Sequence, residues 1–155
     1  MTRIAEDCLH DFSPASERHD WPLERIIDEL DRGYRQAGPV IAAANGRLDV
    51  IALGEWVHAG DVRAALGISP AYAVEGTDDA LALLATCSQT RDTPLLAAHL
   101  PEGDLLMGTW LPHQETPAGL VADADTLVRL YTGRPVNDHP FTLRGAFPAE
   151  LVIYR

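Results

Sequence analysis

The apolar residues of this 155-residue chain change their spacing near residue 90, and this change limits the folds open to the chain. Before that point they recur three, four and seven positions apart, as on one face of a helix. After it, short apolar runs at 95–100 and 105–110 flank a turn at 101–104, which predicts a β-hairpin. We therefore expect an α+β fold, with a helical part over residues 1–90 and an α+β part over 91–155 that holds an antiparallel or mixed sheet.

Capping residues and helix breakers indicate where the helices begin and end. Asp20 and Pro22 favour a helix start, and Gly67 fits the left-handed ending of the next helix. The expected helices run from about Pro22 to Ala44 with a kink or interruption at Gly38-Pro39, from Asp49 to Leu66, onward from a cap at Thr77, and from a cap at Asp123 to Gly133. The strand-like runs after the hairpin are 119–122, 141–144 and 151–154.

Two glycines lie inside the second expected helix, at positions 54 and 60. A glycine in a helix interior costs about 1 kcal/mol relative to alanine. We therefore expect another part of the chain to pack closely against Gly54 and Gly60.

The composition excludes several kinds of function. All 12 basic residues are arginines, so Schiff-base chemistry and a phosphate-loop lysine are excluded. The 23 acidic residues leave a net charge of −11, and we expect no nucleic-acid partner, since that needs a basic surface. No apolar run is long enough for a membrane span, and acids stand where a signal peptide is apolar. We therefore expect a cytoplasmic protein without a membrane partner.

Glu55, His58 and Asp61 form the strongest chemical pattern in the chain. Their spacing of i, i+3 and i+6 keeps them within about 120° of one helix surface. Such a set can ligate a divalent metal if another helix adds a ligand, and His10 is the upstream histidine that could do so. The alternative is a polar helix edge, with His58 hydrogen-bonded and Glu55 in solvent.

Two segments together carry a family resemblance. LGEWVHAGDVRAALG, at 53–67, is similar to a V-H-x-x-D-(I/V)-R-x-x-L-G pattern. PAGLVADADTLVRLYTGRPVNDHPFTLRG, at 117–145, is similar to a D-x-x-T-L-x-R-L-x-x-G-R helix followed by an F-T-L-x-G strand. In this order, with the hairpin between them, they resemble the mycothiol-dependent maleylpyruvate isomerase family over about the last two-thirds of the chain. That resemblance implies a DinB-like helical bundle followed by a sterol-carrier-like α+β domain.

The resemblance also implies a chemistry. Members of this family hold a divalent metal, usually zinc, which activates a low-molecular-weight thiol cofactor as its thiolate. His58 matches a metal-binding histidine and Asp61 matches the acid of the H-x-x-D pattern. The family's other acid falls at Gly54 here, so Glu55, one position later, would take its place.

An arginine of the C-terminal domain holds the acidic substrate in the resembled family. Arg134 matches this position, and Arg144 is the second candidate. From the residues alone, Arg134 fits equally well as a basic residue at the negative end of a helix dipole.

The family's early W-T-x-x-D-x-x-x-H-L segment has only a weak counterpart here, in Cys8-Leu9-His10. We therefore expect a bundle shortened at its N-terminus, whose open face is covered by a second copy in a homodimer. The expected function is non-catalytic binding of a small molecule, and the sequence leaves two cofactor sets open: zinc with a low-molecular-weight thiol, or none. The alternatives are a metal- and thiol-dependent isomerase or transferase acting on a small acidic substrate, and a carrier of apolar ligands.

Overall fold

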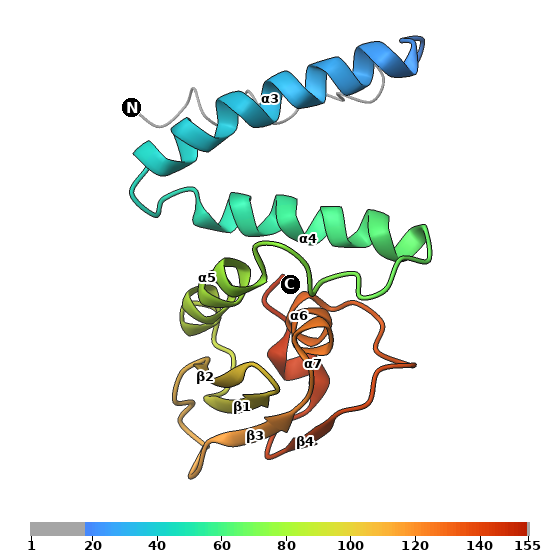
Figure 1. The fold of residues 1–155 in the computed structure, drawn as a ribbon. Helices are drawn as coiled ribbons and strands as arrows, with labels where there is room; N and C mark the ends of the chain where they lie inside the picture. Colours follow the sequence, from blue (N-terminus) through green and yellow to red (C-terminus); the bar gives the residue numbers. More distant parts are fainter. Residues whose placement is uncertain (1–17, 155) are drawn as a thin grey trace. The chain divides into compact units, whose positions relative to one another are not determined.

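A computed structural model of the chain describes residues 18–154, which belong to two compact units. The first unit ends at Gly46 and the second begins at Arg47. In the described residues, the first unit contains helix α3, and the second contains helices α4 to α7 with a four-stranded sheet (Figure 1). The boundary between the two units, after Gly46, differs from the boundary at residue 90 expected from the sequence. The reason is that α5 packs against both α4 and α6.

Helix α3 spans Leu23–Ala43 and begins close to the predicted start, but Asp20 does not cap it: Pro22 takes the capping position, and no side chain caps the helix. Of the expected kink or interruption at Gly38-Pro39, the interruption is wrong, because the helix continues through both residues. A proline removes only its own N–H from the helical hydrogen bonds, and the turns on either side still form. No residue of α3 is buried.

Helix α4 spans Asp49–Ala65 and ends as its sequence predicts. Gly67 adopts a φ of 71°, and the Ile68 N–H donates to the Arg63 carbonyl at 2.9 Å. The buried side of α4 contains Leu53, Val57 and Gly60.

Helix α5 spans Thr77–Gln89, but its start differs from the expectation. Thr77 is the first helical residue and not the cap, because Gly76 before it takes the capping position with a φ of 82°. The Thr77 hydroxyl instead accepts a hydrogen bond of 2.8 Å from the Val74 N–H. The expected apolar stripe of Leu81, Leu84 and Cys87 is buried.

The sheet consists of β1 (Leu96–Leu100), β2 (Gly103–Met107), β3 (Ala118–Val121) and β4 (Thr142–Arg144), in the order β2-β1-β3-β4. It is mixed, because β1 pairs parallel to β3 while the outer pairs are antiparallel. The expected hairpin forms with a shorter turn than predicted. Leu100 pairs with Gly103, so only two residues separate the strands.

Helix α6 spans Ala124–Thr132 and has the predicted cap, since the Asp123 carboxylate accepts from the Thr126 N–H at 2.7 Å. The expected strand at 151–154 is wrong. Helix α7 spans Pro148–Leu151, started by a proline in its first turn and by the Phe147 N–H, which donates to Glu150. The Ile153 N–H then donates to the Tyr131 carbonyl of α6, so this segment never joins the sheet.

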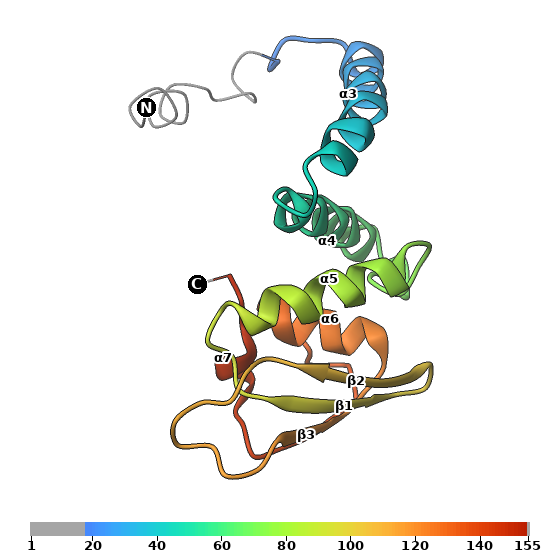
Figure 2. The same cartoon turned by 90° about the vertical axis from the view of Figure 1, so that its left-hand side faces the viewer.

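Helices α5, α6 and α7 cover one face of the sheet (Figures 1 and 2). The core lies between the layers, where the sheet contributes Leu96, Ala98, Leu100, Met107 and Leu120, all buried. On the strands, large residues such as Leu106 and Val121 alternate with these and stay exposed. The predicted α+β class is therefore confirmed. Among residues 18–154, no helix combines the length and apolar character that crossing a membrane requires.

The two glycines of α4 differ in their surroundings. A methyl group at Gly60 would overlap the aromatic ring of Tyr72, whereas a methyl group at Gly54 would meet no atom of residues 18–154 within 4 Å. The expected close packing is thus confirmed at Gly60 and wrong at Gly54.

Gly60→Ala should lower the free energy of unfolding by about 1–3 kcal/mol, because the Tyr72 ring must move to admit the methyl group. Gly54→Ala, on the same helix, should raise it by about 0.5–1 kcal/mol through helix propensity alone. Urea unfolding of both variants measures the difference. Equal effects of the two substitutions would contradict the packing described for Tyr72.

Candidate functional site

A charged network joins α4 to the chain that follows α6. The Asp61 carboxylate accepts two hydrogen bonds from the Arg134 guanidinium, from Nε at 3.0 Å and from Nη2 at 2.7 Å. The Tyr72 hydroxyl donates to the same carboxylate, and His58 Nδ1 lies 3.2 Å from Oδ2. Asp61 therefore has contacts with three side chains, of which only His58 belongs to its own helix.

The local backbone structure at the end of α6 orients the Arg134 side chain toward the Asp61 carboxylate. Gly133 takes a left-handed conformation that ends α6, and the Arg134 N–H then donates to the Arg129 carbonyl at 2.9 Å. Its Nη1 donates to the Thr132 carbonyl at 2.7 Å, so the guanidinium is held on two sides. These bonds orient the Nε–Nη2 edge toward Asp61.

The hydrogen bonds of this network shift the pKa values of Asp61 and Tyr72. The hydrogen bond from Arg134 is the largest cause that holds the pKa of Asp61 well below its usual range, with Tyr72 and His58 adding to it. Burial, aided by the hydrogen bond to Asp61, raises the pKa of Tyr72 to about 12. At neutral pH the site therefore contains a carboxylate and a neutral phenol.

Among the residues that the structure describes, the predicted metal ligands do not come together in one site. His58 is exposed and contacts Asp61, while Glu55 is exposed and has no hydrogen bond or ion pair within residues 18–154. Asp61 is already bound by Arg134 and Tyr72, and within this range no three His, Cys, Asp or Glu side chains are placed to hold a metal ion. His10 lies outside the described residues, so the metal set that includes it stays a prediction.

A second carboxylate, Asp125 of α6, lies almost fully buried beneath the first network. Its Oδ1 accepts from the Tyr72 backbone N–H at 2.6 Å, and its Oδ2 accepts from Arg129 Nε at 2.7 Å. His139 Nδ1 lies 3.5 Å from Oδ2. Burial alone would raise the pKa of Asp125, but the bonds from Arg129 and Tyr72 outweigh it and hold that pKa below the usual value.

Tyr72 links the two carboxylates. Its backbone binds Asp125, its hydroxyl binds Asp61, and the Arg129 guanidinium lies over its ring, 4.7 Å from the ring centre. This single residue in the turn after α4 therefore fixes that turn against α6.

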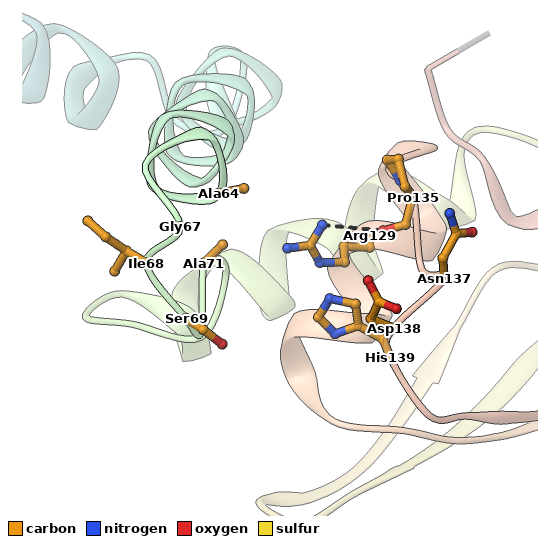
Figure 3. Close-up of a pocket in the computed structure, with 10 residues that line it drawn as sticks. All are labelled: Ala64, Gly67, Ile68, Ser69, Ala71, Arg129, Pro135, Asn137, Asp138 and His139. Carbon is orange, nitrogen blue, oxygen red and sulfur yellow. Dashed lines mark hydrogen bonds between the residues drawn. The ribbon is translucent and has the colours of Figure 1, made fainter.

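A pocket of about 330 Å³ opens beside this turn (Figure 3). One wall is formed by Ala64, Gly67, Ile68, Ser69 and Ala71, and the other by Arg129, Pro135, Asn137, Asp138 and His139. In Figure 3, one terminal nitrogen of Arg129 points to the Pro135 carbonyl, to which it donates at 3.3 Å. The other terminal nitrogen points across the opening toward the 64–71 turn, and His139 lies below it. The pocket thus contains a fixed guanidinium with one N–H group directed into open space.

Sequence patterns predicted only part of this arrangement. They singled out His58, Asp61 and Arg134, which the structure brings together. They missed Tyr72, because its contact with Asp125 joins residues 53 positions apart and has no sequence signature. The Asp125–Arg129 pair, with i,i+4 spacing on a predicted helix, was a signal that could have been found.

Comparison with protein-family models, with curated proteins and with solved structures finds no match to this chain. The geometry of these residues therefore carries the functional argument.

Asp61→Asn should lower the free energy of unfolding at pH 7 by about 1–2 kcal/mol, because it weakens charged hydrogen bonds that are partly open to solvent. The folded pKa of Asp61 is lowered, so its contribution is complete above the unfolded value of about 3.9 and is lost as the pH falls below that value. The gap between wild type and variant should therefore narrow below about pH 4.

Urea unfolding between pH 3 and pH 7 checks this prediction. Glu55→Gln is the matched control, since this exposed carboxylate on the same helix has no hydrogen bond or ion pair within residues 18–154. A loss of stability in Asp61→Asn no larger than in the control would contradict the role given to Asp61.

Proposed function

We propose that this protein binds a small polar molecule without catalysing a reaction on it, and that the pocket beside Arg129 is its binding site. The observation that carries the proposal is the Arg129 guanidinium. Two of its nitrogens are fixed by Asp125 and by the Pro135 carbonyl, and the third is directed into the pocket. A donor held in place in this way loses little conformational entropy when a ligand accepts from it.

The charges around the pocket indicate the kind of ligand. Asp125 neutralises Arg129, and Asp138 adds a second acid to the wall. The chain as a whole carries −11 and attracts no anion from a distance. These features favour a neutral or singly charged molecule that presents a carbonyl or carboxylate oxygen, and the pocket volume suits a small molecule.

The pocket wall also supports binding over covalent catalysis. Ser69 is its nucleophile-type side chain, and within residues 18–154 it makes no hydrogen bond to His139 or to any other base. Arg134, the arginine matched to the family's substrate clamp, is bound by Asp61 instead. We therefore propose a non-catalytic relative of the maleylpyruvate isomerase family, in which this arginine stabilises the fold.

Binding is tested by following backbone amide NMR shifts while propionate, succinamide, nicotinamide and glucose are added as separate probes at millimolar concentrations. We expect at least one carbonyl- or carboxylate-bearing probe to shift residues 64–71 and 135–139 together. Ala64→Trp should abolish the shifts by filling the pocket, whereas Ala65→Trp, outside the pocket wall, should keep them. Shifts elsewhere only, or none with any probe, would overturn the proposal.

Metal analysis separates this proposal from the metal- and thiol-dependent alternative. For protein purified without chelators, we expect His58→Ala to leave the metal content unchanged, because the described residues place no further ligand beside His58 and Asp61. His113→Ala, a histidine in an exposed loop, is the control. About one equivalent of metal that disappears only in His58→Ala would instead support the enzyme.

A further inference from the structure

The apolar residues of α3 follow the repeat of a coiled coil. Their spacing alternates between four and three residues over most of the helix: Leu23, Ile27, Leu30, Tyr34, Ala37 and Ile41. This alternation is the heptad pattern, which keeps one narrow seam facing a second helix along its whole length.

The seam is open in the structure. The four large side chains at its start, Leu23, Ile27, Leu30 and Tyr34, are 53–66% exposed, and no residue of α3 is buried. An aligned row of exposed apolar side chains is the signature of an interaction surface, since soluble chains rarely leave one uncovered.

The charges of α3 are divided between its two halves. Residues 23–31 carry four acids and one arginine, whereas residues 32–43 carry two arginines and no acid. Two copies of α3 in parallel would bring like charges together. Two antiparallel copies would place the acidic half of each beside the basic half of the other, and would also oppose their helix dipoles favourably.

Gly33 lies near the middle of the helix, at the flank of the seam. A Cβ atom there would meet nothing within 4 Å, so packing inside the described chain does not require a glycine. Glycine disfavours a helix interior, and one advantage it offers is close approach of another backbone. In an antiparallel pair centred between Leu30 and Tyr34, Gly33 lies where the two helices cross the symmetry axis.

We propose that α3 is a dimerisation helix, which binds α3 of a second copy of this chain in an antiparallel coiled coil. Leu23 of each copy then packs beside Ile41 of the other, Ile27 beside Ala37, and Leu30 beside Tyr34. The interface uses residues 23–41 alone and does not depend on the pocket beside Arg129.

Sedimentation equilibrium of the full chain tests the dimer. The wild type should be dimeric at micromolar concentration, and the double variant Leu30→Glu/Tyr34→Glu should be monomeric because it places charge in the seam. Gln36→Glu adds a charge on the opposite side of the helix and should leave the dimer intact. A monomeric wild type, or a double variant as dimeric as the wild type, would overturn the proposal.

The thermal unfolding of the second unit is a control for these variants. Because no residue of α3 is buried, the double variant should keep the wild-type transition of the core formed by residues 47–154.

Cysteine cross-linking tests the orientation, in a Cys8→Ser background that keeps the buried Cys87. A mixture of Leu23→Cys and Ile41→Cys chains should form a disulfide between the two different chains. Leu23→Cys alone should not, because antiparallel pairing separates its two copies by about 27 Å along the helix axis. Efficient cross-linking of Leu23→Cys to itself would indicate parallel pairing and overturn the proposed arrangement.

Discussion

Two buried or half-buried carboxylates hold Tyr72 from opposite sides, and the second compact unit depends on these contacts. Asp125 binds the backbone of Tyr72 and Asp61 binds its hydroxyl, while its ring fills the space left by the missing side chain of Gly60. Each acid has an arginine as counterion: Arg129 for Asp125 and Arg134 for Asp61. Partly buried acids are stable only when they are paired and hydrogen-bonded, so the contacts support one another and lock the turn after α4 against α6.

The same contacts determine which arginine is available to a ligand. Arg134 donates from Nε and Nη2 to Asp61 and from Nη1 to the Thr132 carbonyl, so its charge is already paired with a carboxylate and an anion would compete with Asp61 for it. Arg129 is also paired, but its pairing leaves one nitrogen directed into the pocket. The proposed site follows from this difference in how the two guanidinium groups are bound.

Local signals predicted the elements that local interactions stabilise. Three such features are present: the Asp123 cap, the left-handed glycines after α4 and α6, and the hairpin between β1 and β2. Each depends only on residues that are close in sequence. The predictions failed where one pattern fits two structures. Leu151 and Ile153 alternate as in a strand, but Pro148 starts a short helix and both side chains are buried beside α6 instead. Leu151 and Ile153 would be buried in a strand as well as in this helical segment. The alternation of apolar residues therefore could not distinguish the two structures.

The sequence by itself determined the α+β class, the absence of lysine chemistry and the helical spacing of the apolar residues in α3, because each is a property of composition or of spacing along the chain. Only the tertiary structure decided the roles of Asp61, Arg129 and Arg134. Asp61 and Arg134 are 73 positions apart in the sequence, and no repeating pattern between them indicates the pairing. Contacts across such separations form when packed elements bring the groups together, and the free energy of burying a charge then selects which acid meets which arginine.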